Sequence, residues 1–247
     1  KITGVYLDKV NNKKDLEGNI DKVLAQLNNN ILNDMDLNTA EKYLYWLNQL
    51  GADYIKNEKN FNYMSLMRYK RGSVVKANFG FKIGSEQGGL HYAVVLDNRN
   101  HKSNKVLMVV PIESLPDGKS PDDINKNYEV FLGYGIFKDE IDYVEKRISS
   151  LQRKISKLKA DKKDCFKQER QLRKLRKELV SLNKGSVAQI AQTCAMSKIR
   201  IYNPKHAKDR YSSFILGDDK LNEIERKLKE LYFKKTEKNI QKDEENT

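Results

Sequence analysis

The residues best suited to chemistry lie in residues 80–98, where a glycine-rich polar loop runs directly into an apolar strand. Glycines in such a loop permit positive φ and let the backbone approach a ligand closely. Polar side chains between the glycines supply hydrogen-bonding groups, and a histidine stands where the loop becomes the strand. The composition indicates a ligand-binding loop, or else a long hairpin connection whose glycines serve only the turn. The residues concerned are Gly84, Ser85, Glu86, Gln87, Gly88, Gly89 and His91.

Short apolar runs on both sides of this loop predict the strands that must position it. The runs are separated by Gly, Asn, Asp and Pro, which is typical of an antiparallel sheet with short connections. They are residues 72–79, 92–96, 106–111 and 129–132.

Residues 1–62 predict a helical extension, because apolar residues such as Leu16, Ile20, Leu27 and Ile31 recur at helical spacing. An element of two helices is too short to bury both of its apolar faces alone. We therefore expect it to pack on the following domain, on a second copy of the chain, or on a partner.

Residues 139–183 predict an antiparallel coiled-coil hairpin, since apolar residues alternate by three and four on both sides of a charged turn at residues 161–164. The segment contains fourteen Lys or Arg and eight Asp or Glu, so it carries +6 of the chain's net charge of +13. This surface fits a solvated helix face, an RNA clamp, or a surface for dimerisation or partner docking.

The 247 residues include 47 Lys or Arg and 34 Asp or Glu, and the pI is near 9.4. This balance favours an anionic partner, and nucleic acid is favoured over a membrane because no long apolar segment occurs. Cys165 and Cys194 lie far apart without metal-ligand spacing, so neither a metal nor a cofactor is expected. No signal-peptide pattern is visible at the start of the sequence, and a cytoplasmic location is expected.

Three blocks, in order along the chain, are similar to the MazF/PemK family of bacterial toxins, ribosome-independent endoribonucleases that pair with an antitoxin. The first runs from Arg-Gly-Ser-Val-Val through Gly-Ser-Glu-Gln-Gly-Gly to Ala-Val-Val-Leu and resembles the family's first strand, loop and second strand. The second is Val-Val-Pro-Ile-Glu-Ser, and the third runs from Gly-Ser-Val to a glutamine and on to Lys-Ile-Arg. The blocks lie in residues 71–96, 109–114 and 185–200.

The resemblance implies an α+β fold with a small SH3-like antiparallel β-barrel of the MazF/PemK/CcdB type, formed by residues 67–137 and 184–240. Strands are then expected to resume at residues 186–190 and 197–202, and a helix at about residues 218–235 closes the fold. The coiled-coil hairpin, which the family core does not have, becomes an insertion whose removal should preserve the barrel.

The resemblance also implies where RNA is cleaved. In the family an Arg follows the glycine loop and a Thr follows the third strand, and both act at the scissile phosphate to leave a 2′,3′-cyclic end. Here His91 and Glu113 stand at those positions, and Ser114 comes next in the chain as a third catalytic candidate. Histidine titrates near neutral pH and could form an acid and base pair with glutamate, but the replacement could also mark a lost activity.

Polar and cationic residues around these three are implied to bind the RNA, through phosphate contacts and through contacts with unpaired bases. They come from the first strands, the glycine loop and the late block. The set is Lys76, Lys82, Ser85, Glu86, Gln87, Gly88, Gly89, Tyr92, Gln192, Lys198 and Arg200.

The sequence is thus interpreted as the toxin of a toxin-antitoxin pair, a metal-independent, single-strand-specific endoribonuclease that acts on RNA as a homodimer. Two other functions stay open. One is a catalytically silent module that binds RNA or protein through the same barrel; the other is a gyrase poison, because a toxin family related in fold acts in that way. The N-terminal helices could serve as an interface, as a cover over the site, or as a fused antitoxin-like element.

Overall fold

The computed structural model describes residues 4–233 and divides after Asn60 into two compact units. In the first unit the apolar stripe of the first helix is only partly covered, with Leu16, Ile20 and Leu24 each roughly half exposed. None of the apolar side chains of residues 4–60 is buried, so this unit has no apolar core of its own. Its helices are α1 (Lys13–Asn33), α2 (Leu37–Gln49) and a π-helical turn (Leu50–Ile55).

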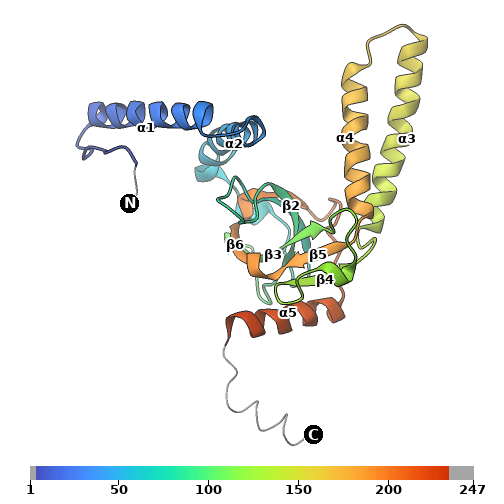
Figure 1. Cartoon of the computed structure of the whole chain (residues 1–247). Helices are drawn as coiled ribbons and strands as arrows, with labels where there is room; N and C mark the ends of the chain where they lie inside the picture. Colours follow the sequence, from blue (N-terminus) through green and yellow to red (C-terminus); the bar gives the residue numbers. More distant parts are fainter. Residues whose placement is uncertain (1–3, 234–247) are drawn as a thin grey trace, which may run out of the picture. The chain divides into compact units, whose positions relative to one another are not determined.

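The second unit is built on one antiparallel sheet of seven strands (Figure 1). The strands follow the order β4-β5-β3-β2-β1-β7, and β6 pairs with the first half of β3 while β5 pairs with its second half. Within residues 4–233, β4 and β7 are the two end strands of this order and do not pair with each other. The strand pairing therefore does not establish the closed barrel expected from the sequence. The strands are β1 (Val74–Asn78), β2 (Leu90–Val95), β3 (Val106–Ser114), β4 (Glu129–Gly133), β5 (Ser186–Gln189), β6 (Cys194–Ser197) and β7 (Ile201–Asn203).

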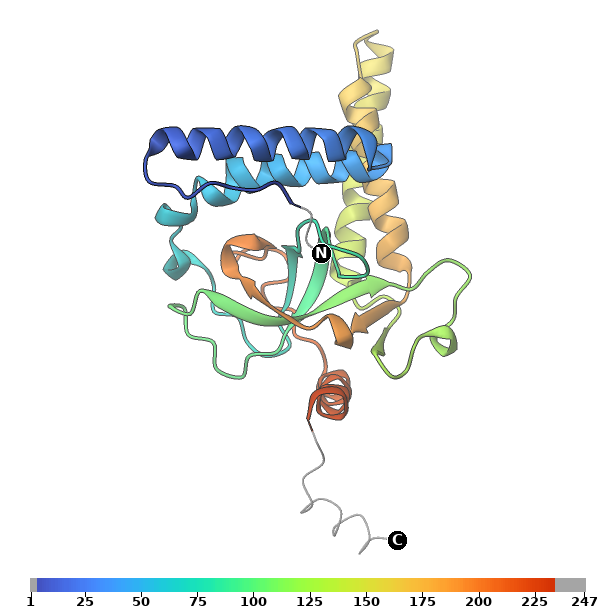
Figure 2. The ribbon, with the colours of Figure 1, turned by 60° about the vertical axis from the view of Figure 1, so that its left-hand side comes forward.

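Three helices complete this unit, which confirms the predicted combination of helices with an antiparallel sheet. The first two pack against each other as a hairpin that projects from the sheet, as Figure 2 also shows. Among the described helices, none is both long and apolar enough to cross a membrane. The last residues expected in the closing helix and in the barrel domain, 234–240, lie outside the described residues. The helices are α3 (Lys138–Ala160), α4 (Phe166–Asn183) and α5 (Asp218–Tyr232).

The central strands are apolar on both faces, so the sheet has two cores. Successive side chains of a strand point to opposite faces, and successive valines accordingly belong to different cores. The base of the hairpin and α5 cover the first face, and β6, β7 and residues 61–69 enclose the second. The first, which we call the hairpin face, carries Val74, Val94, Val110 and Ile112, and the second, the loop face, carries Val75, Ala93, Val95 and Val109.

The base of the hairpin is part of the core of the sheet. Val144 of α3 and both Leu175 and Leu182 of α4 are buried together with the residues of the hairpin face. This argues against the expectation that residues 139–183 can be removed without loss, because three core side chains would leave with them.

Two predicted strand limits are also corrected. Residues 197–202 do not form one strand, because the 3-10 turn Lys198–Arg200 separates β6 from β7. β3 does not end at Pro111, although proline lacks the N–H for a ladder bond. It continues to Ser114 because its last three residues pair with β5. Other 3-10 turns are Glu58–Asn60, Tyr63–Ser65, Pro121–Asp123 and Ile190–Gln192.

A truncation separates the part of the hairpin that the core needs from the rest. Replacing residues 155–172 with a glycine turn should leave a cooperatively folding chain, because Val144, Leu175 and Leu182 stay in place. Deleting residues 139–183 should abolish folding, since losing each of these buried side chains costs about 2–5 kcal/mol of a typical stability of about 5–15 kcal/mol. Urea unfolding followed by circular dichroism measures both. A full deletion that unfolds cooperatively at the wild-type midpoint would contradict this.

Candidate active site

The glycine-rich loop is closed at its neck by backbone hydrogen bonds. The N–H of Phe79 donates to the carbonyl of Gly89, and the N–H of Gly89 donates to the carbonyl of Gly80, both at 2.7 Å. Gly89 has φ +85°, and a Cβ at Gly88 would lie only 3.0 Å from the Gly80 carbonyl oxygen. A side chain at Gly88 would therefore press on the carbonyl that closes the neck, and one at Gly89 would be strained.

The far part of the loop is held by one side chain from the end of the sheet. Gln192, in the turn between β5 and β6, accepts a hydrogen bond from the N–H of Gln87 (3.1 Å) and donates one to the carbonyl of Ser85 (3.0 Å). Both ends of its amide thus bind the loop backbone. The sequence predicts that Gln192 binds RNA. In the structure its side chain instead binds the backbone of the loop that is predicted to contact RNA. The side chains of Ser85 and Glu86 remain exposed.

His91 and Glu113 lie beside each other on the loop face. Tyr92 pairs with Ile112 in the β2–β3 ladder, and the continued register brings His91 opposite Glu113. Both residues are half-buried. The His91 ring also lies edge-on to the buried Phe79, with the ring centroids 6.4 Å apart. The structure therefore brings together the two residues that the sequence singles out as an acid and base pair.

The surroundings of His91 keep its imidazole neutral near pH 7. Burial lowers the pKa of His91 below its ordinary value of about 6.5. The charge of Glu113 and hydrogen bonds with the backbone of Gly88 and Ile112 act in the opposite direction but do not outweigh burial. A neutral imidazole next to a carboxylate can accept a proton, and the carboxylate then stabilises the imidazolium that forms.

Ser114 and Lys76 do not join this pair, because both lie on the hairpin face. Ser114 is one residue after Glu113 in a regular ladder, and its hydroxyl lies 2.8 Å from that of Ser181 in α4. The Nζ of Lys76 forms an ion pair at 3.0 Å with Glu178 of α4. Burial opposes the charge of Lys76, but Tyr92 and Glu178 hold its pKa above the ordinary value. The predicted roles of Ser114 in catalysis and of Lys76 in phosphate binding do not fit these partners.

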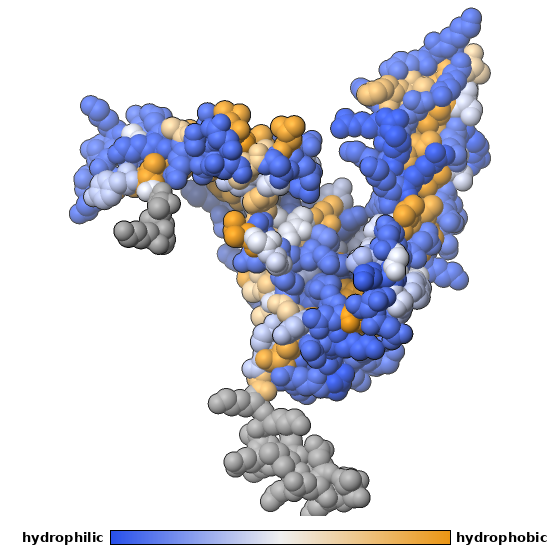
Figure 3. Space-filling model, in the orientation of Figure 1, coloured by the Kyte–Doolittle hydropathy of each residue, from blue (hydrophilic) through white to orange (hydrophobic). Residues whose placement is uncertain are grey.

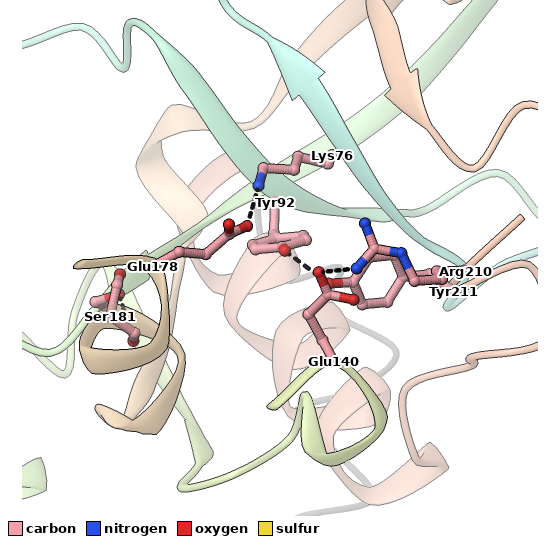
Figure 4. A network of polar contacts seen from close by, with 8 residues as sticks. Lys76, Tyr92, Glu140, Glu178, Ser181, Arg210 and Tyr211 are labelled. Atoms are coloured by element: carbon pink, nitrogen blue, oxygen red, sulfur yellow. Dashed lines mark hydrogen bonds and ion pairs between the residues drawn. The ribbon is translucent and has the colours of Figure 1, made fainter. Parts of the chain in front are cut away.

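Tyr92, also predicted to bind RNA, belongs to the same internal network (Figure 4). Its ring stacks on Phe137 with centroids 4.4 Å apart, and its hydroxyl lies 2.7 Å from that of Tyr211. Glu140 of α3 is buried and forms an ion pair with Arg210. Burial raises the pKa of both phenols and of Glu140, although the Arg210 guanidinium acts to lower that of the carboxyl. The ring and hydroxyl of Tyr92 are therefore occupied inside the fold.

The acidic members of this network could have been found from the sequence. Glu178 lies three residues after Leu175 and four before Leu182, and Glu140 lies four residues before Val144, so both carboxylates fall on an apolar stripe. A charge on such a stripe has to find a partner, because an unpaired buried charge is costly. Nothing in the sequence, however, indicates which residue that partner is.

The predicted cations near the loop separate into two groups. Lys198 is only 1% exposed, and its ammonium donates to the backbone carbonyl of His101 at 3.2 Å. This placement is incompatible with a contact to RNA phosphate. Lys82 lies on the loop itself, and both Lys82 and Arg200 act electrostatically on the thiol of Cys194, whose pKa burial nevertheless raises. Lys82 forms an ion pair with Glu86 of the same loop (Nζ to Oε2, 3.7 Å). Lys82 and Arg200 stay the predicted sources of positive charge near the loop.

Comparison with known proteins gives one family. Residues 70–161 match the model of a family described as PemK-like, MazF-like toxin of type II toxin-antitoxin system. No curated protein matches the chain. The match spans β1 to β4 with the loop, His91 and Glu113, and it confirms the resemblance for the first two blocks. The third block, residues 185–200, lies outside the matched residues. It also covers α3, so it does not set the hairpin apart from the family domain.

The hydrogen bonds of Gln192 can be tested directly in the loop. A Gln192→Ala variant loses both bonds, each worth about 1 kcal/mol net, so amide exchange at Gln87 should accelerate about five- to tenfold. The amide of Gly89, which bonds to Gly80 instead, should keep its rate and serves as the internal control. Hydrogen exchange followed by NMR measures both. Equal acceleration at the two amides would indicate general destabilisation and not the loss of a clamp.

Proposed function

We propose that the chain is a metal-independent endoribonuclease that cleaves single-stranded RNA, because residues 70–161 match the family model of the PemK-like, MazF-like toxins of type II toxin-antitoxin systems. An RNA substrate and an antitoxin partner follow from the family. The products are a 2′,3′-cyclic phosphate and a free 5′-hydroxyl.

One observation carries this proposal beyond the family match. His91 and Glu113, which replace the Arg and Thr expected at the scissile phosphate, are cross-strand neighbours on the face that carries the loop. Two titratable groups that are placed together at an expected catalytic position form a reaction site more readily than two that are scattered. The loop beside them has a fixed neck and exposed polar side chains, as a surface that receives a single strand requires.

The chemistry follows from the charge states of the pair. Neutral His91 removes the proton of the ribose 2′-hydroxyl, and the 2′-oxygen then attacks the adjacent phosphorus. Glu113 stabilises the imidazolium as it forms. Lys82 and Arg200 supply positive charge for the phosphorane, whose extra negative charge would otherwise be repelled by Glu113. The bond to the 5′-oxygen breaks, and this oxygen leaves with a proton from solvent.

The family also implies finer features that we include in the proposal. The sheet would be the SH3-like barrel of these toxins, and two copies would pair as a homodimer. Apart from the family, the apolar spacing of residues 139–183 predicts that α3 and α4 form a coiled coil. The packing of α3 against α4 along an apolar stripe supports this coiled coil.

A second function, a catalytically silent module that binds RNA, is favoured by one feature of the same site. An Arg carries positive charge at any pH, whereas a neutral His91 next to Glu113 offers none to a phosphorane. The two functions differ in whether RNA is cut, and they do not differ in whether it binds.

A cleavage assay decides between them. Purified chain is incubated with a long single-stranded RNA in the presence of a chelator, and the new ends are mapped by sequencing. Wild type should cut and leave cyclic phosphate ends. The His91→Ala variant should lose about 10²- to 10⁴-fold in kcat, which is the usual contribution of a general base. The Glu113→Ala variant should also lose activity, because the imidazolium that forms is no longer stabilised.

The matched control is His101→Ala, because His101 is an exposed histidine whose ring forms a hydrogen bond with the nearby Ser103. This variant should cut at the wild-type rate. Wild type that binds RNA but leaves it intact would support the silent module. A rate unchanged in His91→Ala would keep the activity but remove the assignment of the site.

The lowered pKa of His91 predicts the pH profile. The imidazole should stay neutral at pH 7, and kcat/KM should fall only below about pH 6.5 as the ring becomes protonated. Glu113→Gln removes a charge that raises this pKa, so its acid limb should move to lower pH. Steady-state rates between pH 5 and pH 8, roughly the range in which histidine titrates, test this. If the pH below which kcat/KM falls is higher in Glu113→Gln than in wild type, the pairing of His91 with Glu113 is contradicted.

A further inference from the structure

The positive charge of the chain is concentrated in the distal part of the hairpin. Residues 146–177, which we call the basic arm, contain fourteen Lys or Arg and only three Asp or Glu, a net charge of +11 against +13 for the whole chain. The base of α3 is acidic instead, with Asp139, Glu140, Asp142 and Glu145. The charge therefore changes sign along the hairpin, and the positive end is the one away from the sheet (Figure 1).

The charges of the basic arm are available to a partner. All fourteen Lys and Arg side chains are exposed. Within residues 4–233 only Lys159 and Lys163 of these fourteen form an ion pair, with Glu169 and Asp161. Like charges at this density repel one another, so an anion that neutralises them is favoured.

The outer surface of the arm suits a polyanion better than a folded protein partner. Its apolar residues lie between the helices, where Ile155 and Leu175 are buried, and Figure 3 shows this apolar stripe between hydrophilic outer faces. Phe166 is the only large apolar side chain well exposed in the arm, all of which is described. Protein interfaces depend on buried apolar and aromatic anchors, whereas phosphate binding needs exposed cations.

The spacing of the cations also fits a phosphate chain. Lys167, Arg170, Lys174 and Lys177 follow one another at intervals of three, four and three residues, which places them on one stripe of α4. Adjacent charges on such a stripe are about one helical turn apart, roughly 5 Å along the axis. No member of this stripe forms an ion pair within residues 4–233.

We propose that the basic arm binds the phosphate backbone of RNA outside the cleavage site. RNA as the polyanion rests on the proposed function, while the presence of a phosphate-binding surface rests on the charge and exposure of the arm. Contacts to phosphate carry no sequence information, so the arm adds affinity and speeds association without changing which sequence is cut.

The experiment measures binding without cleavage, so that it can be interpreted even if the chain does not cut RNA. All proteins carry His91→Ala, and the probe is a fluorescent polyuridylate of about 40 nucleotides, whose binding is followed by anisotropy over a range of salt concentrations. The arm variant is Lys167→Gln, Arg170→Gln, Lys174→Gln and Lys177→Gln combined. Glutamine has a helix propensity close to those of Lys and Arg, so the helix should persist, and circular dichroism checks it.

The matched control removes four exposed lysines of the first unit, Lys9, Lys14, Lys42 and Lys59, each replaced by glutamine. The arm variant should lose about 100-fold in affinity at about 0.15 M salt, and its slope of log affinity against log salt should be shallower by about 2 to 3. The control should keep the wild-type slope. An arm variant with the affinity and slope of the control overturns the proposal.

Two further measurements separate RNA binding from other uses of the charge. Polyglutamate of similar total charge should bind far more weakly than polyuridylate, and equal affinity for both would overturn the assignment to RNA. In proteins with His91 intact, the arm variant should raise KM for the long RNA at unchanged kcat. The same variant should leave KM unchanged for a dinucleotide, which contains only the scissile phosphate.

Discussion

The second unit depends on one constraint: its central strands β1, β2 and β3 are apolar on both faces, so both faces have to be covered. The base of the hairpin and α5 cover one face, and β6 and β7 with residues 61–69 enclose the other. Burial of apolar area on two faces is the main stabilising term of such a sheet. Covering both faces with apolar side chains leaves little room for polar groups within the sheet. The polar site lies at the start of β2, directly after the glycine-rich loop.

The polar side chains that do lie on the hairpin face are paired with groups from the hairpin or from the segment before α5. Lys76 meets Glu178, Tyr92 meets Tyr211, and Glu140 meets Arg210. Buried charges are tolerated only when they are paired in this way, and removing one partner leaves the other uncompensated. The backbone of Tyr211 is in the left-handed region, with φ 67°. This conformation destabilises a residue other than glycine by about 1–2 kcal/mol. The hairpin base is thus fixed to the strands whose opposite face carries the proposed site.

This arrangement separates two tasks along one chain. Chemistry is assigned to the loop face, where His91 and Glu113 are half-buried and the loop is held by Gln192. Net charge is concentrated in the basic arm, on side chains that are exposed. The cations of the arm attract a polyanion through charge that is separate from the pair of His91 and Glu113.

The sequence by itself determined the features that depend on local patterns: the glycine loop, most strands, the two helices of the hairpin, and the pairing of His91 with Glu113 as a candidate site. These follow from periodicity, turn residues and a family resemblance that spans adjacent strands. Only the tertiary structure decided that Ser114 and Lys76 face away from His91, that Lys198 is buried, and that Gln192 holds the loop. The physical reason is that these outcomes depend on contacts between distant segments, such as Lys76 with Glu178, 102 residues apart. Local periodicity indicates that a side chain is buried or faces one side, but it does not identify the partner that the fold brings there.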